Sequence, residues 1–147
     1  MGIFDNEMMF SEEQRVCNGG AAEASTNVYD FGVASPNVAK GEPMVLLFTV
    51  TEVFAGTATT LTITAQSSSD NAEADAYADI TGISTGAIAK ATLVAGYQFT
   101  LPLPSHATYG RWMQILYTGD NTFETTGKIT CALAIGGAVQ TNKAPGA

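Results

Sequence analysis

The sequence predicts an all-β domain, an antiparallel β-sandwich or jelly roll with an extended N-terminal arm. Short hydrophobic segments recur along the 147 residues, and several of them alternate with the period of a strand. Gly, Asn, Asp and Ser separate these segments, as they do at turns between strands. The chain also holds 19 threonines, and their β-branched side chains suit a pleated surface. The length fits one domain, and no internal repeat or linker divides it.

Two segments in the first half are the clearest strands. The segment from Pro43 to Phe54 is apolar on both faces at its start, which predicts a central strand. The segment from Thr59 to Ser68 alternates, with Leu61, Ile63 and Ala65 on one side and threonines on the other. This pattern predicts a half-buried strand whose polar face meets solvent or a partner.

Further apolar segments bounded by turn residues also predict strands. We expect them over residues 28–33, near residue 80, and over residues 87–94, 97–103, 109–118 and 128–135. Residues 119–121 and 125–127 have the composition of turns. After a break at residues 67–71, residues 72–78 are predicted to form a short helix or an ordered loop.

The two ends of the chain differ from its body. We assign residues 1–12 to an N-terminal arm, residues 13–140 to the sandwich and residues 141–147 to a loose tail. The arm mixes large apolar side chains with acids and amides, without clean alternation. It either tucks into its own domain or lies on a partner, and the sequence favours neither. Its candidate interface residues for a capsid or a second copy are Ile3, Phe4, Met8, Met9 and Phe10.

Composition excludes several classes of partner. Charged residues make up only 14% of the chain, and its net charge is −8. Six scattered lysines and arginines form no basic stripe, so we expect neither nucleic acid nor an anionic membrane as partner. The longest apolar run, Pro43 to Val50, is too short to cross a bilayer, and the N-terminus lacks a signal peptide. We therefore expect synthesis in a host cytoplasm. A low-charge surface also costs little to desolvate against another protein, although a plain structural β-protein shares this composition.

The residues that support catalysis or metal binding are sparse. The single histidine, His106, lies in a segment of turn composition, and no nucleophile elbow accompanies it. Cys17 and Cys131 lie in apolar stretches, which favours two free, buried thiols over a disulfide. We expect no catalytic residue, no metal and no cofactor. The acidic stretch lacks the pattern of a calcium loop, so a solvated loop is favoured over a cation site; its residues are Asp70, Asn71, Glu73, Asp75 and Asp79.

Aromatic residues bear on a different class of function. A carbohydrate-binding sandwich needs an exposed aromatic platform, which Tyr77, Tyr109 or Trp112 would have to supply. Trp112, the only tryptophan, lies among Met113, Ile115 and other apolar residues. We therefore expect it in the core.

The order and spacing of several segments resemble the capsid cement (decoration) proteins of tailed phages. The similarity covers nearly the whole chain except residues 67–86, and it depends on order more than on any one piece. The segments are Ile3–Ser11, Val28–Gly32, Lys40–Pro43, Leu93–Phe99, Leu101–Pro104, Arg111–Tyr117, Thr126–Leu133 and Val139–Asn142.

This resemblance implies a jelly-roll-like sandwich that associates as a homodimer or homotrimer and performs no catalysis. It also implies binding on the outer surface of the virion, across junctions of a major capsid protein with the HK97-type fold. Two other hypotheses stay open beside it. One is a carbohydrate-binding sandwich used in host attachment, and the other is a hydrolase whose residues are not recognisable in the sequence.

Overall fold

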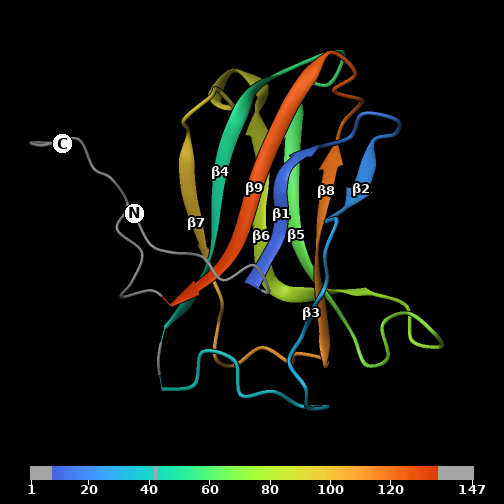
Figure 1. Cartoon of the computed structure of the whole chain (residues 1–147), viewed down its shortest axis with the longest axis vertical. Coiled ribbons are helices and arrows are strands. Elements are labelled where there is room, and N and C mark those ends of the chain that lie inside the picture. The colour runs from blue at the N-terminus through green and yellow to red at the C-terminus, as the bar shows by residue number, and fades with distance from the viewer. Residues whose placement is uncertain (1–7, 42, 136–147) are drawn as a thin grey trace, which may run out of the picture.

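The computed structural model describes residues 8–41 and 43–135, which form two antiparallel sheets packed face to face (Figure 1). The four-stranded sheet has the order β1 (Met9–Arg15), β9 (Thr126–Ile135), β4 (Met44–Ala55), β7 (Gln98–Pro102). The second sheet has the order β2 (Ala22–Ala24), β8 (Trp112–Gly119), β5 (Thr60–Ser68), β6 (Ala78–Ala89), and β3 (Tyr29–Asp30) also pairs with β8. The predicted antiparallel β-sandwich is confirmed.

The strand order is that of a jelly roll. Each strand of the four-stranded sheet has a counterpart at the same place in the order of the second sheet. The two members of each pair are consecutive in sequence: β1 and β2, β9 and β8, β4 and β5, and β7 and β6. A long hairpin of strands that wraps around itself produces this arrangement. A short 3₁₀ turn, η2 (Lys90–Thr92), leads from β6 toward β7.

The core lies between the inward faces of the four central strands. Each strand contributes every second side chain, as the two-residue period of a strand requires. The inward residues are Leu46, Phe48, Val50 and Phe54 on β4, Leu61, Ile63 and Ala65 on β5, Met113, Ile115 and Tyr117 on β8, and Ile129, Cys131 and Leu133 on β9. The prediction of β4 as a central strand is confirmed, because it pairs with both β9 and β7.

The boundary of the predicted arm needs correction. Residues 9–12 belong to β1, which pairs with β9 from Met9↔Ala132 to Arg15↔Lys128. Phe10 is only 1% exposed and belongs to the core cluster. The sandwich therefore begins at residue 9 rather than 13. Residues 1–7 and the predicted tail, 141–147, lie outside the described residues.

Other segments also differ from the prediction. Only Tyr29 and Asp30 of residues 28–33 form a strand, and β2 was not predicted at all. The strand predicted over residues 87–94 is instead the end of β6 followed by η2. Residues 126–127, predicted as part of a turn, begin β9. Residues 69–77 form a turn-rich loop that projects from the sandwich, with no helical segment within it (Figure 1).

Three outermost strands, β6, β7 and β1, are poor templates for a further strand. In β6 the register shifts twice against β5, and Gly82 and Gly86 have positive φ angles of 90° and 66°. On the other sheet, β7 ends in Pro102, which has no amide hydrogen, and β1 shifts register on both sides of Ser11. Bulges and proline are devices that discourage edge-to-edge pairing.

Candidate functional site

The outward side of β5 and β8 forms a continuous polar, uncharged surface, which we call the threonine face. Buried and half-buried residues alternate regularly from Thr60 to Gln66 and throughout β8, and the order reverses only at Ser67 and Ser68. Residues directly opposite in the antiparallel ladder share a face, as Thr62↔Thr118 and Thr64↔Leu116 do. The threonine face comprises Thr60, Thr62, Thr64 and Gln66 on β5 and Trp112, Gln114, Leu116 and Thr118 on β8.

Small residues extend the threonine face on both sides. From β2, Ala22 and Ala24 lie opposite Thr118 and Leu116. From β6, Ala87 lies opposite Thr62. These small side chains flank the middle of the face, where a flat partner could approach closely, whereas Arg111 lies over Trp112 at one end.

Side-chain amides on the threonine face satisfy one another. The Nε2 group of Gln114 donates to Oε1 of Gln66 at 2.9 Å, and Nε2 of Gln66 donates to the Asp79 carboxylate at 2.8 Å. Asp79 lies opposite Gln66 on β6, at the margin of the face. Because these groups already have partners, covering them would leave fewer polar atoms unpaired than covering isolated amides would.

The prediction that Trp112 lies in the core is wrong. Trp112 points outward and is half-buried, while its neighbour Met113 points inward and is completely buried. The guanidinium of Arg111 lies 5.4 Å from the centre of the indole ring. Asp30 holds this guanidinium through two hydrogen bonds of 2.7 and 2.9 Å. The hydrogen bond from Arg111 also lowers the pKa of Asp30 below its usual value.

The other two candidate aromatics do not form a platform with Trp112. Tyr109 is 5% exposed, and its hydroxyl donates to the carbonyl of Pro104 at 2.7 Å. Burial raises the pKa of Tyr109 to about 12. Tyr77 is half-buried in the loop after β5 and donates to Oδ1 of Asn71 at 2.7 Å.

The candidate interface residues of the arm do not form one exposed patch. Met8 is half-buried and packs against the core, and Met9 is half-buried in β1. Phe10 lies inside the sandwich with its ring 6.4 Å from that of Tyr29. This placement corrects the expectation that Phe10 lies on a partner. Ile3 and Phe4 lie outside the described residues.

The acidic loop uses its carboxylates to fix its own backbone. Asp70 accepts hydrogen bonds from the amides of Ala74 and Asp75 at 2.8 and 3.1 Å, and Asp75 accepts one from the amide of Ser69 at 2.9 Å. Within residues 8–41 and 43–135, no three His, Cys, Asp or Glu side chains are placed to hold a metal ion. The carboxylates of Asp70 and Asp75 thus act as turn caps.

The candidate nucleophiles and bases stay apart. His106 is exposed in the loop between β7 and β8. Cys17 and Cys131 are both free and buried, as predicted, and burial raises the pKa of each thiol. A thiol that stays protonated is a weak nucleophile. In the part of the chain that the structure describes, no helix is long and apolar enough to cross a membrane.

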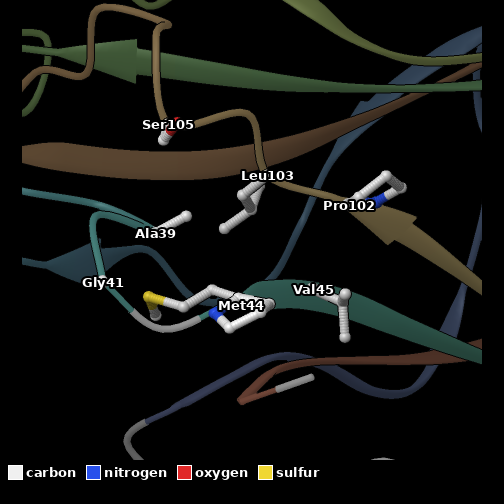
Figure 2. A pocket seen from close by; sticks show the side chains of 8 residues that line it. Ala39, Gly41, Met44, Val45, Pro102, Leu103 and Ser105 are labelled. Carbon is white, nitrogen blue, oxygen red and sulfur yellow. The ribbon is translucent and has the colours of Figure 1, made fainter. Parts of the chain in front are cut away.

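A pocket of about 320 Å³ opens at the end of the sandwich where β4 begins and β7 ends (Figure 2). Its lining is apolar apart from Ser105, with Met44 and Val45 on β4 facing Pro102 and Leu103. These side chains include no group that titrates near neutral pH. The residues that line the pocket therefore offer no acid or base for catalysis.

Comparison with known proteins places the chain in a family. No curated protein matches the sequence. A family model, that of the Bbp16 family, matches residues 10–133, which run from β1 into β9 and include both sheets. The match covers more than four-fifths of the 147 residues. The chain belongs to the Bbp16 family.

Proposed function

We propose that this protein is a structural capsid cement protein of a tailed phage. In this role it binds the outer surface of the capsid, at junctions between major capsid proteins of the HK97-type fold, and stabilises the expanded shell. The resemblance of the ordered segments to cement proteins supports the proposal, and so does the jelly-roll strand order. The single observation that carries it furthest is the threonine face.

The chemistry of the threonine face suits contact with another folded protein. Apart from Leu116 and Trp112, its side chains are short or carry hydrogen-bonded amides, and no lysine or arginine belongs to it. Burial of such a face removes few ionised groups from water, which keeps the desolvation cost low. Alanine and threonine methyl groups contribute apolar area at about 25 cal/mol per Å². Each copy would bind with modest affinity.

The outward side of the other sheet is a weaker candidate. Leu47 of β4 lies on that side, yet it is only 6% exposed within this chain. The apolar centre of that side is thus already covered. The threonine face has no comparable buried residue on its outward side apart from Ser68 at its end.

Modest affinity per copy is sufficient when copies act together. We propose that the protein associates as a homodimer or homotrimer, with each copy engaging one part of the capsid lattice. Linked binding sites multiply the effective affinity without any new contact. The role requires no catalysis, and the isolated positions of His106, Cys17 and Cys131 are in keeping with this.

The alternative, a carbohydrate-binding sandwich for host attachment, has one observation in its favour. Trp112 faces outward beside Gln114, and sugars stack on such rings while amides bind their hydroxyls. However, Arg111 lies over the ring and Tyr109 is buried. An open stacking face is therefore not available at Trp112 unless Arg111 moves.

A binding assay with expanded capsids tests the proposal. Purified protein should bind capsids that lack it and raise the temperature at which they rupture. The Thr62→Lys variant, in the middle of the threonine face, should bind at least about tenfold more weakly, because a buried unpaired charge costs more than 1.4 kcal/mol. Thr100→Lys, on the outward side of β7, is the matched control and should bind as wild type does.

Equal rupture temperatures with and without the protein would contradict the cement role. Retained capsid binding by Thr62→Lys, together with loss in Thr100→Lys, would assign docking to the other sheet. Binding to a glycan array that is lost in Trp112→Ala would support the alternative instead.

A further inference from the structure

The loop between β1 and β2 presents an Asn-Gly pair on a rigid support. The amide of Cys17 donates to the Glu23 carboxylate at 2.7 Å, and the carbonyl of Cys17 accepts from the amide of Phe123 at 2.9 Å. On the other side of the loop, the amide of Gly119 donates to the carbonyl of Ala21 at 2.7 Å. The residues between these anchors, Asn18 and Gly19, are exposed.

The backbone nitrogen of Gly19 is open to reaction. Among the described residues, no hydrogen bond uses this amide as a donor. A Cβ atom placed on Gly19 would meet nothing within 4 Å, so the space beside its α-carbon is open. Asn18 is also the one asparagine of the sequence that precedes a glycine.

Arg15 activates the other reaction partner, the side-chain amide of Asn18. Its Nη2 group donates to Oδ1 of Asn18 at 3.0 Å, and the same nitrogen reaches the carbonyl of Glu124 at 3.3 Å. A hydrogen bond from a cation draws electron density from the amide carbonyl and stabilises the negative charge that develops on its oxygen during nucleophilic attack. The guanidinium is thus placed where an oxyanion would form.

We propose that Asn18-Gly19 is a site of spontaneous covalent modification, at which Asn18 is converted to aspartate and isoaspartate. The Gly19 nitrogen attacks Cγ of Asn18, a new N–Cγ bond forms, and the Cγ–Nδ2 bond breaks. Ammonia leaves with the proton that Gly19 loses, and a cyclic imide remains. Water then opens the ring, at Cγ to give aspartate or at the backbone carbonyl carbon to give isoaspartate. No oxidant or enzyme is required.

The remaining described asparagines are less suited to this reaction. Asn121 accepts a hydrogen bond at Oδ1 from the amide of Thr122 at 2.9 Å, and Thr122 is the residue whose nitrogen would have to attack. Asn27 and Asn37 each precede a valine, whose branched side chain hinders approach to its nitrogen. For Asn71, the attacking nitrogen would be that of Ala72, whose amide already donates to Oγ of Ser68 at 3.0 Å.

The modification has a defined structural consequence. Aspartate at position 18 adds one negative charge beside Arg15, so the neutral hydrogen bond becomes an ion pair. This pair would tie the loop after β1 more tightly to the loop that precedes β9. Isoaspartate instead inserts an extra methylene into the backbone at the tip of the loop.

The test follows the intact protein during incubation at mildly alkaline pH. Cleavage after Arg15 and Lys40 gives one peptide, residues 16–40, that contains Asn18, Asn27 and Asn37. Its mass should rise by the difference between an amide and a carboxyl group, with oxygen incorporated from heavy-oxygen water. Fragmentation should place the change at Asn18, at a rate about tenfold or more above that at Asn27 and Asn37.

Two variants test the contributions of the Gly19 nitrogen and of Arg15 separately. Gly19→Ala fits the loop without a clash, because the added methyl meets nothing within 4 Å, and it should slow the reaction about tenfold by hindering the nitrogen. Arg15→Gln should slow it several-fold while the thermal midpoint is monitored, since Arg15 also binds backbone carbonyls. The proposal is overturned if Asn18 stays unmodified while a synthetic peptide of residues 16–24 converts fully. It is equally overturned if Gly19→Ala reacts at the wild-type rate.

Discussion

Ser11 and Tyr117, 106 positions apart in sequence, share a hydrogen bond of 2.8 Å inside the core. Ser11 donates its own hydrogen to Oε1 of Gln14 at 2.7 Å, so the Tyr117 hydroxyl is the donor to Ser11. The bond joins β1 of one sheet to β8 of the other. Burial raises the pKa of Tyr117 well above its ordinary value, and the hydroxyl stays neutral.

This bond predicts unequal effects for its two partners. Ser11→Ala leaves the buried hydroxyl of Tyr117 without this acceptor and should lower the free energy of unfolding by about 1–3 kcal/mol. Tyr117→Phe removes the donor and should cost about 1 kcal/mol. Urea unfolding of both variants and of the double variant checks this. Fully additive effects would show that the two groups do not interact.

The start of the sandwich at β1 predicts two different outcomes for truncations. Deletion of residues 2–7 removes Ile3 and Phe4 and should leave the thermal midpoint nearly unchanged. Deletion of residues 2–10 also removes Met9 and Phe10 from β1, and loss of a buried Phe side chain alone costs about 3–5 kcal/mol. Calorimetry distinguishes the two.

If the arm contributes to docking, the shorter deletion should weaken capsid binding or self-association while the domain remains folded. A truncated protein that assembles and binds capsids as wild type does would remove the arm from the proposed interface. A shorter deletion that unfolds the domain would place Ile3 and Phe4 in the fold.

Two carboxylates at one end of the sandwich predict acid sensitivity. The hydroxyl of Thr59 hydrogen-bonds Asp120 and lowers the pKa of this carboxyl to about 2. In the same way the hydroxyl of Thr57 lowers the pKa of Glu124 to about 2. In the unfolded chain such groups titrate near pH 4. Because the folded-state values are lower, these groups stabilise the fold fully above about pH 4 and lose this contribution as the pH falls toward about 2.

The thermal midpoint measured from pH 5 to pH 2 checks this prediction. It should fall in this window for the wild type and fall less steeply for the variants Asp120→Asn and Glu124→Gln. Both variants should also have a lower midpoint at pH 7, because an amide cannot replace all the acceptor bonds of a carboxylate. Identical pH profiles for wild type and variants would contradict the assignment.

Gly127 in β9 packs so closely against Phe54 that a larger residue at this position should destabilise the fold. A Cβ atom on Gly127 would lie 2.7 Å from the ring of Phe54, and the φ angle of Gly127 is 146°, which other residues rarely adopt. Gly127→Ala should therefore lower the free energy of unfolding by about 1–3 kcal/mol. Gly19→Ala, which meets nothing, is the control and should change stability by less than about 0.5 kcal/mol.

How well each strand could be predicted depended on how regular its alternation is. β5 alternates regularly from Thr60 to Gln66, and its polar face could be predicted. β1 was not, because a polar residue, Ser11, is buried there and Glu13 has a positive φ of 45°, which breaks the period. β2 is three residues long with no large side chain, and only its ladder with β8 defines it as a strand.

For the side chain of Trp112, the apolar composition of its neighbourhood gives the wrong location, whereas the alternation along β8 gives the right one. Its apolar neighbours favoured a place in the core, yet Met113, Ile115 and Tyr117 occupy alternate positions that exclude Trp112 from the same face. The period of β8 could have corrected that prediction from sequence alone. The ion pair between Arg111 and Asp30 beside the ring joins residues 81 positions apart, and no local pattern reveals it.

The most direct test of the proposed role is a cryo-EM map of the intact particle that carries this protein. We expect jelly-roll density on the outer capsid surface, over junctions between major capsid proteins, with Thr62 and Thr64 turned toward the shell. Density confined to the tail, or sandwiches whose threonine face points to solvent with no neighbouring copy against it, would contradict the proposed role.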